Sequence, residues 1–220
     1  TFIGSITWLV YQCGGYFGIT ALSMAIYSNS PIALAILKLF QELEEWISAN
    51  HANLPNGAVK AFIFGGCAFH IHTNARGSND IDAEIQAIQL LKKQDILLFL
   101  ANNDVEYLDD NNLETNLEFD SGFNTSLASI DPDYDERVIP LISDSIVEVY
   151  LVSGLDLAIS KLARLSDRDI EDIKELYLKG KFSLEEFKKS ANNAKDYYAT
   201  PEQLDSNIHY MESLLSELKG

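Results

Sequence analysis

The residues of this chain that are best suited to chemistry lie within residues 64–85. Gly65 and Gly66 follow a short apolar run, and Asp80 and Asp82 come after a gap of thirteen residues. Glycines at the end of a strand let backbone N–H groups approach a phosphate, and the N-terminus of a following helix favours negative charge. Alternate residues of a strand project to one face, so we expect the two carboxylates to lie together.

A glycine turn opposite two carboxylates has the parts that a magnesium–triphosphate site requires. Magnesium prefers oxygen ligands, and two such ions can stabilise both the entering and the leaving oxygen of a phosphoryl group. Each part alone is common in ordinary turns and solvated strands. Together, with Arg76 and Ser78 leading into the acidic pair, they favour a catalytic site or one that has lost its activity.

The elements that must position this segment follow from the apolar pattern. Apolar or alternating runs predict strands at 59–64, 80–85, 117–120 and 146–152. Periodicity and end signals predict helices at 31–50, 89–101 and 155–165. Three further helices are introduced by apparent capping boxes, namely Ser166 with Asp169, Ser183 with Glu186, and Thr200 with Gln203. The pattern is that of an α+β core followed by a small C-terminal helical bundle.

Charge and cysteine content exclude some functions. The 220 residues include 33 acidic and 16 basic side chains, for a formal net charge of −17. Gripping a phosphate backbone needs a basic surface, so extended nucleic-acid binding is disfavoured. Two cysteines are too few for a disulfide framework and favour a reducing compartment, for which we expect the cytoplasm.

Residues 1–29 are hydrophobic and carry no charged side chain. Their length would suit a membrane span, but glycines and polar residues dilute the run, and the basic start of a secretory signal is missing. The segment is therefore a non-native extension, a packed appendage or a membrane segment, and we expect no membrane role unless it is a genuine span. We expect the core at 30–153 and the helical region at 154–220.

The segment of residues 64–85 resembles the nucleotidyltransferase superfamily of DNA polymerase beta and kanamycin nucleotidyltransferase. The shared pattern is Gly-Gly, a short helix and then Arg-x-Ser-x-Asp-x-Asp. More narrowly, the chain from about Ala33 to Leu215 is similar to uncharacterised bacterial nucleotidyltransferase-like proteins, distant relatives of abortive-infection toxin nucleotidyltransferases. The blocks that carry this closer resemblance are 119–120 with 123–125, 134–137, 156–164 and 168–173.

The resemblance implies a mixed-sheet nucleotidyltransferase core in which Asp80 and Asp82 match the paired metal-binding carboxylates. A third carboxylate normally comes from a neighbouring strand, and Asp120 is our choice. Glu118 and Glu148 are the alternatives. Glu118 shares a face of the strand with Asp120 by the period of two, so spacing alone does not separate these two residues. Asp120 would ligate a second metal ion or act as the base for the acceptor hydroxyl.

The same resemblance implies which residues hold the nucleoside triphosphate. Gly65 and Gly66 would cradle it, and Arg76 and Ser78 would add contacts. Lys161, Arg164 and Arg168 could supply further cationic contacts from the first helices of the tail. Salt bridges to Asp167, Asp169 and Asp172 are the structural alternative for these cations.

The implied reaction transfers a nucleoside monophosphate to an unknown acceptor (a protein, a small molecule or an RNA end), with release of pyrophosphate. The implied cofactor is Mg²⁺, with two ions. The alternative is a degenerate nucleotide-binding or interaction protein that works with a protein partner, as in a toxin–antitoxin-like or defence system, because a fold does not fix a function.

Two other metal patterns are weaker. Cys67, His70 and His72 suggest zinc, but a helix would point the two histidines in different directions and no second ligand cluster follows. The acidic run at 131–135 imitates the start of a calcium loop, but it lacks the required glycine and the final acid.

Overall fold

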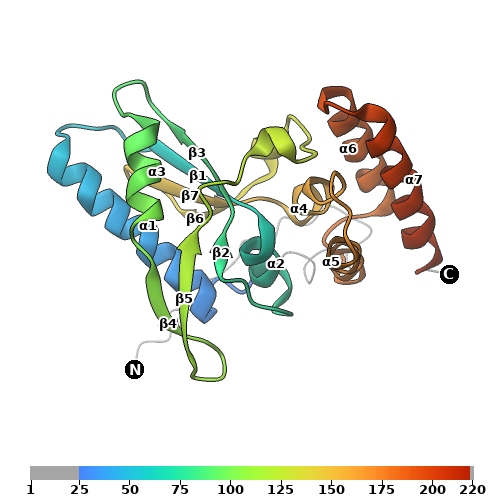
Figure 1. Ribbon diagram of the computed structural model, residues 1–220, viewed down its shortest axis with the longest axis horizontal. Helices are drawn as coiled ribbons and strands as arrows, with labels where there is room; N and C mark the ends of the chain where they lie inside the picture. Colours follow the sequence, from blue (N-terminus) through green and yellow to red (C-terminus); the bar gives the residue numbers. More distant parts are fainter. Residues whose placement is uncertain (1–24, 219–220) are drawn as a thin grey trace, which may run out of the picture.

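Seven strands form two sheets in the part of the chain that the computed structural model describes, residues 25–218 (Figure 1). The sheet with order β3-β1-β7-β6 is mixed, because β1 runs parallel to β7 and antiparallel to β3. The second sheet has the order β2-β5-β4. The strands are β1 Val59–Ile63, β2 Asp80–Ile81, β3 Ala83–Ala87, β4 Val105–Leu108, β5 Glu114–Phe119, β6 Ile139–Ile142 and β7 Val147–Leu151.

Helices flank the two sheets on two sides. Figure 1 shows α1 and α3 on one side, α4 to α7 on the other, and α2 between the strands and this second group. The helices are α1 Pro31–Asn50, α2 Gly65–Thr73, α3 Lys93–Ala101, α4 Gly154–Ser160, α5 Asp167–Leu178, α6 Leu184–Tyr197 and α7 Pro201–Glu217. The predicted α+β class with C-terminal helices is confirmed, and the division into a core and a separate helical domain stays a prediction.

The helix starts follow local chemistry. Ser30 accepts a hydrogen bond from the backbone N–H of Ala33, ahead of a proline in the first turn of α1. Complete capping boxes begin α5 at Ser166 and α6 at Ser183, as the sequence predicts. The third predicted box is wrong, because the side chain of Thr200 makes no capping hydrogen bond although α7 begins directly after it.

Two predicted helices are shorter than expected. α3 begins at Lys93, because Ile88 to Leu91 form a turn in which the N–H of Leu91 donates to the carbonyl of Ile88. α4 ends at Ser160, and the chain then turns to Leu165, whose φ of 44° is left-handed and cannot continue a helix.

The predicted strand at 80–85 is divided in two at Asp82. The carbonyl of Ile81 accepts from the N–H of Asp120 at 3.0 Å, while the carbonyl of Asp82 accepts from the N–H of Phe64 at 2.8 Å. Successive carbonyls therefore bond to different sheets. Asp82 is the point at which the chain passes from β2 in one sheet to β3 in the other.

The uncharged segment 1–29 lies largely outside the described residues, so its status stays a prediction. Within residues 25–218, none of the helices combines the length and the apolar character that crossing a membrane would require.

A buried histidine joins α2 to the end of β7. His72 is 2% exposed, and its Nε2 lies 2.8 Å from the carbonyl oxygen of Val152. Because that partner can only accept, Nε2 carries the proton in the neutral ring. Nδ1 is buried and has no hydrogen-bond partner in the described part of the chain. A second proton on this ring would therefore be buried without an acceptor.

This arrangement predicts a loss of stability in mild acid. Burial, only partly offset by the hydrogen bond to Val152, lowers the pKa of His72 to about 4. An unfolded histidine titrates near about 6.5, so below that pH the unfolded chain takes up the proton first and the native state loses stability. From this residue we expect the free energy of unfolding to fall by about 2 kcal/mol between about pH 7 and pH 5.

Urea unfolding at a series of pH values measures this loss. The control is His72→Gln, whose amide can still donate to Val152 but does not titrate in this range. The variant should have a shallower dependence of stability on pH than the wild type. Parallel curves for the two proteins would contradict the prediction.

Candidate functional site

The glycine turn is built around the side chain of Asp82. Gly65 has a left-handed φ of 62°, and a Cβ atom at this position would overlap the Asp82 carboxylate. The backbone N–H of Gly66 donates to the same carboxylate. The start of α2 thus places its free N–H groups beside an anion, which is the arrangement that helix N-termini favour.

Asp120, directly after β5, lies in the same pocket as Asp82 and the glycine turn. This strand runs parallel to β2, with Asp80 opposite Glu118 and Ile81 opposite Phe119, so Asp120 follows in line with Asp82. Gly65, Asp82 and Asp120 line one pocket of about 280 Å³. Further residues lining it are Phe123 and Asn124 from the loop after β5, and Ser160, Lys161, Arg164 and Asp169 from the first C-terminal helices.

The electrostatics of this pocket centre on Asp82. Burial, followed by the negative charges of Asp120 and Asp80, raises the pKa of Asp82 to about 6, against the opposing effects of Lys161 and the Gly66 N–H. A carboxylate whose pKa is raised by burial and by neighbouring negative charges is a candidate functional group.

The remaining predicted carboxylates lie further from the pocket centre. Asp80 is exposed and does not line the pocket, although its charge contributes to the raised pKa of Asp82. Glu118 is exposed beside Asp80. Glu148 pairs across the sheet with Lys60 and contacts Gly57, at the opposite end of β1 from the glycine turn. Its carboxylate accepts a hydrogen bond from Tyr150.

Arg76 and Ser78 lie against Gly66. A Cβ atom on Gly66 would meet the side chains of both residues. The guanidinium of Arg76 donates two hydrogen bonds to Asp172 of α5, at 3.1 and 2.5 Å, and its centre lies 4.9 Å from the centre of the Phe69 ring. Arg76 therefore holds the segment before the acidic residues against the C-terminal helices.

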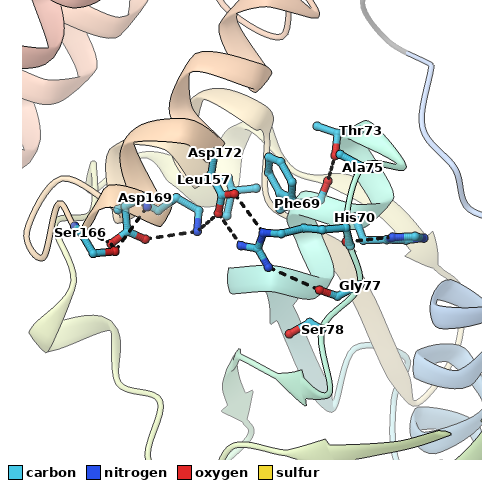
Figure 2. Close-up of polar contacts among 12 residues, drawn as sticks. Phe69, His70, Thr73, Ala75, Gly77, Ser78, Leu157, Ser166, Asp169 and Asp172 are labelled. Atoms are coloured by element: carbon cyan, nitrogen blue, oxygen red, sulfur yellow. Dashed lines mark hydrogen bonds and ion pairs between the residues drawn. The ribbon is translucent and has the colours of Figure 1, made fainter.

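Lys161 and Arg164 line the pocket but are paired with carboxylates. The side chain of Lys161 is only 7% exposed. Its Nζ lies 2.8 Å from Oδ2 of Asp172 and 3.6 Å from Oδ1 of Asp169. Arg164 donates two hydrogen bonds of 2.8 Å to Asp169 and is otherwise exposed. Figure 2 shows a chain of polar contacts that runs from Ser166 past Asp169 and Asp172 to the loop at Gly77. Arg168 is exposed.

The pKa of Asp169 reflects these ion pairs. Burial alone would raise the pKa of Asp169, but hydrogen bonds from Arg164 and Ser166 and the charge of Lys161 hold it well below its usual range. The salt bridges that the sequence left as an alternative for Lys161 and Arg164 are therefore present, and both cations still face the pocket.

Sequence reasoning missed the central role of Asp172. It joins Arg76 of the glycine-turn segment to Lys161 of the tail, although 96 residues separate it from Arg76. The available signal was the acidic pattern at the start of α5, which indicated Asp172 only as a possible partner for the cations of the tail. That pattern does not reveal that Arg76 folds against it as well.

Neither weaker metal pattern forms a site. Burial, then the charges of Asp82 and Asp80, raises the pKa of the Cys67 thiol to about 12, and Cys67 donates to the carbonyl of Asp80 instead. Asp131 is buried and paired with Arg137. Among residues 25–218, no three His, Cys, Asp or Glu side chains are arranged so that they could hold a metal ion, so Asp80, Asp82 and Asp120 do not form a closed ligand set.

A comparison with known protein families gives a match over most of the chain. A family model described as a nucleotidyltransferase of unknown function, DUF6036, matches residues 35–214. The match covers nearly the stretch over which the chain resembles nucleotidyltransferase-like proteins, and it confirms that resemblance. No curated protein matches the chain.

Proposed function

The chain belongs to the DUF6036 family of nucleotidyltransferases of unknown function, and we propose that it transfers a nucleoside monophosphate from a nucleoside triphosphate to an acceptor hydroxyl with the help of Mg²⁺. The acceptor oxygen would attack the α-phosphorus, and the bond from that phosphorus to the bridging oxygen of pyrophosphate would break. The observation that carries the proposal is the pocket in which the glycine turn, two carboxylates and two cations meet.

The donor set of this pocket fits a hard divalent cation. Asp82 and Asp120 present carboxylate oxygens from adjoining strands, and their mutual repulsion would be relieved by a cation between them. These two residues would hold the ion, and Asp80 would join them after a local movement. A bound Mg²⁺ would neutralise charge on the phosphates and polarise the phosphorus–oxygen bond.

The remaining residues would bind and orient the triphosphate. The N–H groups at Gly65 and Gly66 would donate to phosphate oxygens, and Lys161 and Arg164 would add positive charge from the opposite wall. Asp120 would alternatively accept the proton of the acceptor hydroxyl. Catalysis would rest on positioning and charge neutralisation, as in other phosphoryl transfers.

Calorimetric titration of the full chain with each of the four nucleoside triphosphates, with and without Mg²⁺, tests the binding step. We expect micromolar, Mg²⁺-dependent binding of at least one nucleotide. The absence of binding to all four would overturn the proposal. A nucleotide that binds would then be used to search for an acceptor by following pyrophosphate release.

Two observations favour a second function, that of a nucleotide-binding interaction protein without transferase activity. The three candidate carboxylates do not form a closed ligand set within residues 25–218, and the cations of the pocket are already paired. Under this alternative a nucleotide would bind, but no pyrophosphate would be released with any acceptor.

A further inference from the structure

A second cavity lies on the other side of the Arg76 segment. It has a volume of about 250 Å³, slightly below the range of about 300–1,000 Å³ that is usual for ligand sites, so it suits a small molecule. It lies between the start of α1, the loop after α2 and the β4–β5 hairpin. Among the described residues, 25–218, none lines both this cavity and the pocket of Asp82. Its polar walls include Asn74, Ser78, Asn79, Tyr107 and Thr115.

A buried histidine lines the cavity, and one of its ring nitrogens makes no hydrogen bond within residues 25–218. His70 is 5% exposed, and its Nδ1 lies 3.0 Å from the carbonyl oxygen of Arg76. Because a carbonyl only accepts, Nδ1 carries the proton and Nε2 of the neutral ring offers a lone pair. Nε2 is buried and has no hydrogen-bond partner among residues 25–218. Figure 2 shows the ring pointing away from Asp172.

The charges that line this cavity are negative on balance. Arg76 is the cation of the lining, and its charge is matched by Asp172. Asp109 and Asp110 add two carboxylates from the hairpin loop. One oxygen of Asp109 accepts from the backbone of Asn111 and Leu113, while the other has, among the residues that the structure describes, only the Asn111 side chain at 3.4 Å. The site therefore offers acceptors and negative charge to a ligand.

We propose that this cavity binds the ammonium group of a small, polar amine. Nε2 of His70 accepts one N–H, and the carboxylates of Asp109 and Asp110 supply the opposite charge. Leaving a buried acceptor unpaired is unfavourable, so a ligand that donates a hydrogen bond to it gains affinity. This inference stands on its own lining residues and does not depend on nucleotidyl transfer.

The test uses three amines, each with an uncharged hydroxyl analogue: ethanolamine with ethylene glycol, putrescine with 1,4-butanediol, and glucosamine with glucose. The full chain, labelled with ¹⁵N in its histidines, is titrated by NMR. We expect at least one amine to bind saturably, about tenfold or more tighter than its analogue, and to shift the Nε2 resonance of His70. Equal affinity for amines and analogues, or no binding of any amine, would overturn the proposal.

Two variants assign the binding to this cavity. His70→Phe removes the acceptor, and Asp109→Asn with Asp110→Asn removes the charge without altering the core. Each should weaken amine binding by about tenfold or more. Asp104→Asn is the matched control, since this carboxylate does not line the cavity and its loss should leave the affinity unchanged. Amine binding that survives in both test variants would refute the site, whatever the nucleotide titration shows.

Discussion

Replacing Asp82 and Asp120 together by asparagine is expected to lower Mg²⁺-dependent binding of the nucleoside triphosphate, and any nucleotidyl transfer, by at least about a hundredfold. The reason is that asparagine keeps the size of each side chain but removes the negative charge that would hold the cation. The fold should persist, because burial and the neighbouring carboxylates already disfavour the charge on Asp82. Calorimetry and pyrophosphate release measure the loss, and urea unfolding checks the fold.

Two single variants serve as controls for this pair. Glu118→Gln removes an exposed charge from β5, the strand that leads to Asp120. Glu148→Gln removes a charge from β7, beside the end of β1 that is remote from the glycine turn. Both should bind nucleotide as the wild type does. Asp80→Asn tests the exposed aspartate apart from the two residues of the pocket. We expect this variant to lose less affinity for the nucleotide than the Asp82/Asp120 double variant does. Unchanged affinity in the Asp82/Asp120 double variant would show that the site is placed wrongly.

Asp172→Asn is expected to cost about 3–5 kcal/mol of stability, because it removes the charge that compensates two buried or half-buried cations. Asp172 is 3% exposed and pairs with both Arg76 and Lys161. Lys161 would keep only the longer contact to Asp169. Urea unfolding followed by circular dichroism measures the change in the free energy of unfolding.

The neighbouring residue provides the matched comparison. Glu171→Gln also removes one negative charge from α5, but this side chain is exposed and pairs with Lys174 at the helix surface. Its loss should cost no more than about 1 kcal/mol. Similar costs for the two variants would mean that the buried network contributes nothing beyond an ordinary surface pair.

Local signals predicted the parts of the fold that depend on local chemistry. The capping residues Ser30, Ser166 and Ser183 set helix starts at the predicted places, because a side-chain acceptor satisfies the free N–H groups of the first turn. The glycine turn and Asp82 could likewise be identified, because glycines after a strand suit a phosphate and nearby carboxylates suit a cation.

Contacts between distant segments could not be predicted in the same way. The division of the strand at Asp82 depends on which sheet each carbonyl meets, and strand β4 has a weak apolar signal of its own. The pairing of Asp172 with Arg76 and Lys161 depends on how α5 packs against the core. The sequence left three choices for the proposed third carboxylate, and of these the fold brings Asp120 into the pocket with Asp82.

Because Asp82 lies over the glycine turn, the proposed phosphate binding would be an exchange of one anion for another. The Asp82 carboxylate already accepts the hydrogen bond of the Gly66 N–H and fills the space beside Gly65. An incoming phosphate would therefore compete with this carboxylate for the N–H groups of the turn. Tethered groups compete at effective concentrations on the order of millimolar. Without a bound cation, the affinity of a triphosphate for the turn would therefore be lowered by the whole of this competition. A cation that attracts Asp82 would release the turn, so cation and nucleotide would strengthen each other's binding by the same factor.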